Sequence, residues 1–151
     1  MRLRIARAAA IAALGAVLGL CWNSLSGLGF TLGRNVLIQD GDQLVEVAEA
    51  RIRLDKGALF LDARPAAFHA MSHIPGALSL PEDDFDEAFA RLERRLRSSL
   101  DVVVYCAGFG CEASHIVARK LKERGIPAAI LHDGWPAWED AKYPVRAGAE
   151  P

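Results

Sequence analysis

The sequence predicts an α/β domain, with a parallel sheet covered by helices on both faces, behind one N-terminal transmembrane helix. Short apolar runs alternate with segments of helical spacing, which favours strand–helix–strand units and a parallel sheet. The most apolar run, Val102–Tyr105, is typical of a central strand buried on both faces. The third observation is the stretch from Ala8 to Trp22, which holds no charged residue.

The composition fits one folded domain of ordinary size. The chain has 151 residues, of which 52% are hydrophobic and 25% charged, so it is not a disordered chain. A formal net charge of −1 gives no reason to expect nucleic acid as a partner. Three cysteines are too few for a disulfide framework.

The N-terminal segment has a basic start followed by an apolar stretch. Its basic residues are Arg2, Arg4 and Arg7. Two interpretations remain open: a cleaved signal peptide, for which no clean small-x-small site follows, and an uncleaved anchor over residues 1–25. The anchor is favoured. It would make the chain a single-pass protein of the bacterial inner membrane, with the folded domain on the periplasmic, extracytoplasmic side.

A lipid-anchored alternative for this segment rests on Cys21. The lipid-attachment box of bacterial lipoproteins requires a small residue just before the cysteine, and Leu20 stands there. Cys21 is therefore interpreted as a small apolar residue of the membrane helix.

The remaining chain divides into a linker over residues 26–41, a domain over residues 42–146 and a tail over residues 147–151. Asp42 is predicted to cap a helix that runs to about Leu54, with apolar positions at helical spacing. Later strands are expected over residues 58–61, 77–80, 102–105 and 128–131. Helices are expected after Pro65, from Pro81 and Asp83, over residues 113–124, and as one turn around Trp138 after a turn over residues 132–136.

One of these helices has a clear buried face. Its apolar residues follow one another at spacings of four, three and four: Phe85, Phe89, Leu92 and Leu96. Acidic residues fill its first turn and arginines its last, which suits the helix dipole. From Tyr143 onward, proline and glycine predict a frayed C-terminal tail.

The chemistry is expected at the exit of the strand Val102–Tyr105. Cys106 ends this strand, Gly108 and Gly110 follow, and a helix begins near Ala113. The first amides of a helix lack partners and carry partial positive charge, so they favour an anion. A thiol placed there ionises more readily and becomes a nucleophile at neutral pH.

Four segments in order resemble the landmarks of a single rhodanese domain. They are Phe60–Arg64, His73–Ala77, the strand and loop around Cys106, and Asp133–Trp138. The resemblance covers about Gln43 to Val145 and implies a small α/β fold with a parallel sheet of about five strands. An apolar segment ahead of one such domain is similar to the membrane-anchored bacterial members.

The resemblance also implies a function, a rhodanese-like sulfurtransferase. Cys106 would take up sulfane sulfur as a persulfide from thiosulfate, a polysulfide or a persulfide, and pass it to a thiol or cyanide, without cofactor or metal. The backbone amides of the loop would cradle the sulfur: Ala107, Gly108, Phe109, Gly110, Cys111, Glu112 and Ala113. Four residues would support the site: Asp62 and Arg64 as an ion pair that locks loops, His73 as a hydrogen-bonded structural residue, and Trp135.

The loop departs from the family pattern in ways that question its substrate. Many rhodaneses hold cations after the cysteine, but no arginine or lysine lies between Cys106 and His115. This argues against thiosulfate as the physiological donor. Glu112 also stands where the related cysteine phosphatases need an arginine, which argues against phosphatase activity.

A second cysteine in the loop opens an alternative function. Cys111 lies five residues after Cys106 and could resolve a persulfide, form a disulfide, or simply pack at the start of the helix. The alternative function is accordingly a non-enzymatic partner-binding domain or a Cys106–Cys111 dithiol redox switch.

Overall fold

A five-stranded parallel sheet forms the centre of the fold in a computed structural model of the chain, which describes residues 14–15, 42–108 and 111–148. The order across the sheet is β1-β5-β4-β2-β3, and every pairing is parallel. The strands are β1 (Gln43–Val45), β2 (Leu59–Asp62), β3 (Leu78–Ser79), β4 (Val102–Tyr105) and β5 (Ala129–Leu131). The predicted parallel sheet is confirmed.

The most apolar strand lies at the centre of this sheet, as predicted. β4 pairs with β2 on one side, where Leu61 lies opposite Val104, and with β5 on the other. All four of its residues are buried. A strand covered on both faces and paired on both edges has no solvent-facing position for a polar side chain, which is why Val102–Val104 are uniformly apolar.

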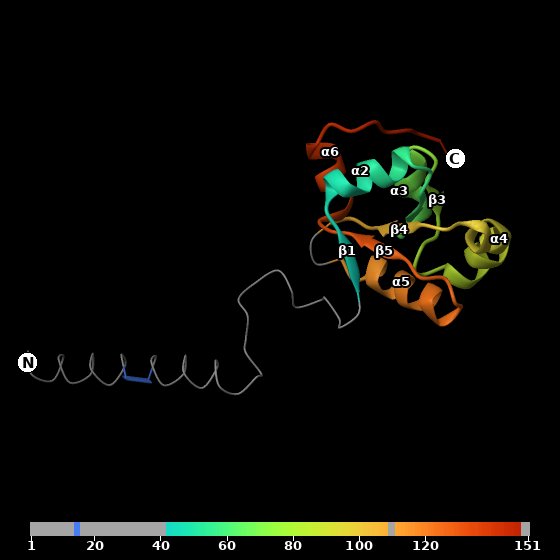
Figure 1. The fold of residues 1–151 in the computed structure, drawn as a ribbon, viewed down its shortest axis with the longest axis horizontal. Coiled ribbons are helices and arrows are strands. Elements are labelled where there is room, and N and C mark those ends of the chain that lie inside the picture. The colour runs from blue at the N-terminus through green and yellow to red at the C-terminus, as the bar shows by residue number, and fades with distance from the viewer. Residues whose placement is uncertain (1–13, 16–41, 109–110, 149–151) are drawn as a thin grey trace, which may run out of the picture. The chain divides into compact units, whose positions relative to one another are not determined.

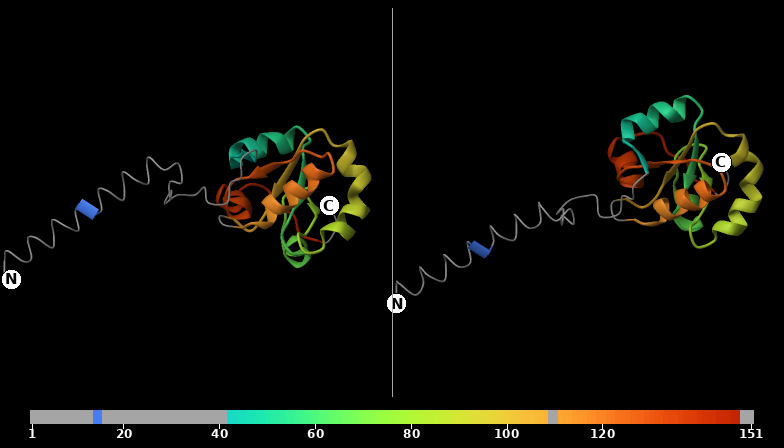
Figure 2. Two further views of the ribbon diagram at one scale, coloured as in Figure 1. Left: turned by 90° about the horizontal axis from the view of Figure 1, so that it is seen from below. Right: turned by 60° about the horizontal axis from the view of Figure 1, so that its bottom comes forward.

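Helices cover both faces of the sheet (Figure 1). In both views of Figure 2, α2 lies on one side of the sheet and α5 on the other. The helices are α2 (Val47–Asp55), α3 (Ala66–Met71), α4 (Phe85–Ser98), α5 (Ala113–Glu123) and α6 (Gly134–Asp140).

Two apolar cores result, one on each face of the sheet. Successive strand residues point to opposite faces, so Val102 and Val104 pack with α4 and α5, while Val103 and Tyr105 pack with α2 and α6. The predicted stripe of α4 enters the first core, with Phe85, Phe89 and Leu96 buried and Leu92 partly buried. Trp138 fills the second core and is fully buried beside Phe60.

The start of the domain differs from the prediction. Asp42 does not cap a helix; it precedes the edge strand β1, and the helix begins only at Val47. β1 forms because Gln43–Val45 pairs in parallel with β5, more than eighty residues later in the chain. The rest of the predicted helix is confirmed as α2, although Ile52, one of its apolar positions, is 53% exposed.

The C-terminal part of the domain also differs. The segment predicted as a turn over residues 132–136 already contains the first residues of α6, which begins at Gly134. The tail expected to fray from Tyr143 is held to the domain as far as Gly148, whose amide donates to the Ala70 carbonyl. Arg146 forms a two-way backbone bridge with His73, and Trp138 donates its indole N–H to the Pro144 carbonyl.

The predicted membrane anchor over residues 1–25 lies outside the described residues, apart from Leu14 and Gly15, which are helical. The linker over residues 26–41 lies outside them as well. Within the described part of the chain, no helix combines the length and the apolarity needed to cross a bilayer.

Candidate functional site

Cys106 lies at the carboxyl end of the central strand, where the chain leaves the sheet. It follows Tyr105 directly, is only 3% exposed, and packs in the core that α4 and α5 share. Ala107 is exposed and Gly108 half-buried, so the chain rises to the surface immediately after the thiol. Phe109 and Gly110 lie outside the described residues.

The loop returns to Cys106 through Cys111, and the two cysteines form a disulfide. Their Cα atoms are 6.3 Å apart, within the range that a disulfide spans. The Cys111 amide donates a hydrogen bond to the Gly108 carbonyl, 3.0 Å away, which turns the chain back. This amide belongs to the predicted sulfur cradle, and in this oxidised form it is engaged by the backbone. On the far side of the loop, the predicted cradle residue Glu112 is exposed and Ala113 opens α5.

The start of α6 supports the base of the loop. The Trp135 amide donates to the Cys106 carbonyl at 2.8 Å. Gly134, with φ +57°, lies so close that a β-carbon there would overlap the Cys106 carbonyl oxygen and approach the Gly108 nitrogen to 2.9 Å. A β-carbon added at Gly108 would likewise lie 3.1 Å from Cγ of the Pro136 ring. Glycine at position 134 is therefore required by backbone contact with the loop.

We expect Gly134→Ala to destabilise the fold by about 2–4 kcal/mol, from strain at positive φ and from overlap with the Cys106 backbone. Gly76→Ala is the matched control, because Gly76 also has a positive φ of +77° but nothing lies within 4 Å of its β-carbon position. The control should lose only about 1 kcal/mol. Urea unfolding of the three proteins measures both values. Equal losses would show that Gly134 is needed for its φ alone.

A buried polar cluster lies beneath the loop, at the ends of β2 and β4. The Arg64 guanidinium donates to both carboxylate oxygens of Asp62, with Nη2 to Oδ2 at 2.6 Å, and the Arg64 amide donates to the same carboxylate. The Tyr105 hydroxyl donates to Asp62 Oδ2 at 2.8 Å and accepts from the Ile74 amide. Nη2 of Arg64 also donates to the Ser72 carbonyl. The expected Asp62–Arg64 ion pair is thus present and ties three segments together.

Protonation states in this cluster follow from burial and from Asp62. Burial raises the pKa of Tyr105 far above its ordinary value, and the neighbouring Asp62 carboxylate raises it further, so the phenol stays neutral. Burial alone would lower the pKa of Arg64, but hydrogen bonds and charge attraction from Asp62 outweigh it and the pKa is raised. The cluster therefore holds one buried cation and its counterion at neutral pH.

Arg64 links the cluster to the loop through Trp135. Its guanidinium carbon lies 4.5 Å from the centre of the Trp135 ring and 5.5 Å from that of Tyr105. Trp135 is the residue whose amide holds the Cys106 carbonyl. The polar cluster is thereby linked to the base of the loop, and the supporting role of Arg64 and Trp135 stays a prediction.

His73 is buried and hydrogen-bonded, and it is stacked on a second buried histidine. The rings of His69 and His73 are parallel, with centroids 4.0 Å apart. His73 Nδ1 donates to the His69 carbonyl at 2.8 Å, and His69 Nε2 donates to the Ala77 carbonyl at 3.0 Å. Burial lowers the pKa of His69, and the neighbouring His73 lowers it further. Both rings join α3 to the segment that leads into β3.

The protein is expected to lose stability as the pH falls below about 6.5, the ordinary pKa of histidine. Because the pKa of His69 is lowered in the folded protein, the unfolded chain binds the extra proton first, and the loss continues down to the folded pKa. His69→Gln, which keeps an N–H donor for Ala77, should flatten this dependence. Denaturant midpoints measured from about pH 7.5 to about pH 5 test it; parallel curves for both proteins would contradict the assignment.

His115, which the sequence places just after the loop, contacts the beginning of the domain instead of the thiol. Its Nδ1 lies 2.7 Å from Asp42 Oδ2, so the first turn of α5 is joined to the chain entering β1. Asp42 therefore has a role different from the predicted helix cap: it connects the start of the domain to the helix that follows the loop.

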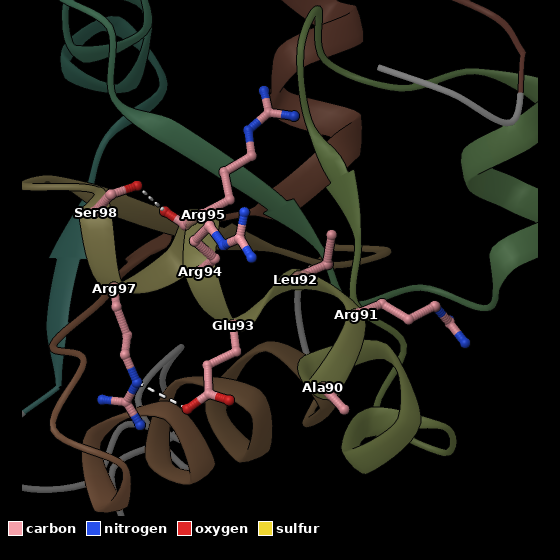
Figure 3. A pocket seen from close by; sticks show the side chains of 8 residues that line it. All are labelled: Ala90, Arg91, Leu92, Glu93, Arg94, Arg95, Arg97 and Ser98. Carbon is pink, nitrogen blue, oxygen red and sulfur yellow. Dashed lines mark hydrogen bonds and ion pairs between the residues drawn. The ribbon is translucent and has the colours of Figure 1, made fainter.

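A pocket also lies away from the predicted site, on α4 between Ala90 and Ser98 (Figure 3). Its arginines include Arg97, which forms an ion pair with Glu93 at 2.8 Å. None of the described residues of the Cys106 loop lines it. Among the residues that the structure describes, no three histidine, cysteine or acidic side chains gather closely enough to hold a metal ion.

Sequence reasoning does not identify two buried polar residues near the site, Tyr105 of the polar cluster and His69 of the histidine stack. The sequence pattern marks Tyr105 only as the last residue of an apolar strand, although a buried phenol usually has a hydrogen-bond partner. That partner is Asp62, which is paired with Tyr105 across β2 and β4, and the pairing becomes visible only in the structure. His69 carried no comparable signal in the sequence.

The fold and the site together define an α/β domain in which a cysteine directly follows the central strand and begins the loop that leads to α5. Comparison with known families matches residues 46–141 to the rhodanese-like domain. The chain therefore belongs to the rhodanese-like domain family, as the sequence predicted.

Three similar proteins place this membership in context. The chain is 32% identical over 103 residues to an HTH-type transcriptional regulator of Mycobacterium tuberculosis; the match covers 68% of the chain but only 44% of that regulator. The rhodanese-like domain of an Anabaena protein is 25% identical, with a TM-score of 0.58, over 70% of the chain and 80% of that domain. A thiosulfate sulfurtransferase from Pseudomonas aeruginosa is 25% identical, with a TM-score of 0.59, over 76% of the chain and 22% of that enzyme.

Proposed function

We propose that the protein is a sulfurtransferase that carries sulfane sulfur as a persulfide on Cys106. The observation that carries this proposal is the position of Cys106, at the carboxyl end of the central strand and at the base of a loop held by α6. Membership of the rhodanese-like family supports it, as does the likeness to a thiosulfate sulfurtransferase. A persulfide forms when the thiolate attacks the sulfane sulfur of a donor and the rest of the donor leaves with its electron pair.

The donor is proposed to be a singly charged sulfane compound, such as a hydropolysulfide ion (HSn⁻) or a low-molecular-weight persulfide, in preference to thiosulfate. Residues 107–114 contain no arginine or lysine to hold a doubly charged group. Glu112 is exposed at the end of the loop and would repel such a group. Arg64, the cation of the supporting cluster, already faces Asp62 and the Trp135 ring. The acceptor would be a thiol, or cyanide in an assay.

The test begins with full-length protein reduced by a dithiol, because the Cys106–Cys111 disulfide leaves neither loop cysteine as a free thiolate. After removal of the dithiol, the protein is incubated anaerobically with an alkyl thiosulfonate, a singly charged donor that leaves as a sulfinate. Sulfinate release should match the chain concentration, and in Cys111→Ser the transferred sulfur should remain attached at Cys106. Absence of stoichiometric sulfinate release would contradict the proposal. A second series with thiosulfate should react more slowly.

We also propose that the N-terminal segment anchors the domain outside the cytoplasmic membrane. The support comes from the sequence: three arginines precede an uncharged stretch over residues 8–22. Fusions of reporters that are active on only one side of the membrane, placed after Pro151, test the orientation. Activity of a cytoplasmic reporter would contradict it.

A further inference from the structure

The second cysteine of the loop is placed where it can react with whatever Cys106 carries. Cys111 is half-buried and packs against the same core as Cys106, and its sulfur is bonded to the Cys106 sulfur across a five-residue separation. The Gly108–Cys111 backbone hydrogen bond keeps the loop folded in this way. A thiol held in the same loop reacts intramolecularly, at an effective concentration of millimolar or more, on the order of cellular thiols.

The disulfide also identifies which sulfur atom Cys111 reaches. A persulfide on Cys106 has an inner sulfur, Sγ, and an outer, transferable sulfur. Attack on the outer sulfur would only move it to Cys111. Attack on the inner sulfur yields the Cys106–Cys111 bond that the structure contains. The geometry of the loop therefore permits attack on the inner sulfur.

We propose, resting on the persulfide function above, that Cys111 resolves the Cys106 persulfide and that the protein reduces sulfane sulfur to hydrosulfide. The Cys111 thiolate forms a bond to Cys106 Sγ, and the bond from Sγ to the outer sulfur breaks. The outer sulfur leaves with the bonding electron pair, takes up one proton and departs as HS⁻. The two cysteines are oxidised to a disulfide by two electrons, and the sulfane sulfur is reduced by the same two.

A dithiol reductant must then reopen the loop. It is oxidised to its own disulfide while Cys106 and Cys111 return to thiols, so each cycle consumes one sulfane sulfur and one dithiol. The class of donor remains a singly charged sulfane compound. The product is hydrosulfide, so sulfur leaves the protein without a separate acceptor molecule. Cys111 would thereby direct sulfur away from transfer and toward release.

The experiment is a single turnover of the full chain. Protein reduced by dithiol and freed of it is mixed anaerobically with an alkyl thiosulfonate, whose sulfinate leaving group cannot itself give sulfide. Sulfide, sulfinate and the Cys106–Cys111 disulfide are each quantified. We expect about one of each per chain. Cys111→Ser should still release sulfinate and hold a stable persulfide on Cys106, with sulfide reduced by roughly tenfold or more. Cys21→Ser is the matched control and should behave as the parent protein.

The outcomes separate the two proposals. Sulfinate release with a lasting persulfide and no sulfide in the parent protein would overturn the resolving role and leave the sulfurtransferase proposal intact. Disulfide formed without sulfide would also overturn it, and would favour a simple redox switch. No sulfinate release from either the parent or Cys111→Ser would overturn both. The parent's ratio of sulfide to disulfide does not depend on the folding of any variant, and Cys111→Ala provides a second test of the thiol.

Discussion

Replacing Cys106 by serine is expected to abolish persulfide formation and to slow sulfur transfer by roughly 10³-fold or more, the scale on which enzymes lose activity with their nucleophile. A serine hydroxyl is not ionised at neutral pH, and it cannot carry sulfane sulfur in an exchangeable sulfur–sulfur bond. The measurement is thiocyanate formed from an alkyl thiosulfonate and cyanide by the full, reduced chain.

Two controls make this result specific. Cys21→Ser removes a thiol outside the family match and should keep the parent rate. Cys111→Ser removes the same disulfide as Cys106→Ser, so comparing the two separates loss of the nucleophile from loss of the cross-link. Transfer at the parent rate by Cys106→Ser would overturn the proposed mechanism.

Asp62→Asn should destabilise the fold by about 3–5 kcal/mol, the usual cost of leaving one member of a buried ion pair without its partner. Asp62 is fully buried and Arg64 is 6% exposed, so solvent cannot compensate the guanidinium. The asparagine would also place an N–H₂ group against donors from Arg64 or Tyr105. A loss of this size is a large part of the 5–15 kcal/mol that stabilises an ordinary domain.

Asp86→Asn is the matched control for this variant. Asp86 forms an ion pair of the same length with Arg124, 2.6 Å, but its side chain is 82% exposed. Exposed pairs contribute about 0–1 kcal/mol. Urea unfolding should therefore separate the two variants by several kcal/mol. Equal losses would mean that the buried pair contributes no more than a surface one.

Features that depend on short stretches of chain could be predicted from the sequence. The uninterrupted valines before Tyr105 indicated a strand buried on both faces, and the structure places β4 at the centre of the sheet. The spacing of Phe85, Phe89 and Leu96 indicated one buried helix face, because helical periodicity is a local property. Cys106 at the exit of the strand followed from the same local pattern.

Contacts between distant segments could not be predicted in this way. The segment Gln43–Val45 is too short for its residue pattern to indicate a strand. It forms a strand because it pairs in parallel with the edge of β5. Tyr105 gains its role from Asp62, and Gly134 from the Cys106 carbonyl, both through close approach of separate segments. Folding also holds the C-terminal segment against His73, where composition alone suggested fraying.

The Cys106 loop shows the same division within a few residues. Its sequence determined that a thiol ends a strand, that a second thiol follows five residues later, and that no cation lies between them and His115. The sequence does not decide whether the two thiols meet, because an extended chain would separate Cα atoms five residues apart by far more than a disulfide spans. The tertiary structure decided it: the turn closed by Gly108 and Cys111, on a base held by Gly134 and Trp135, brings the two Cα atoms within 6.3 Å.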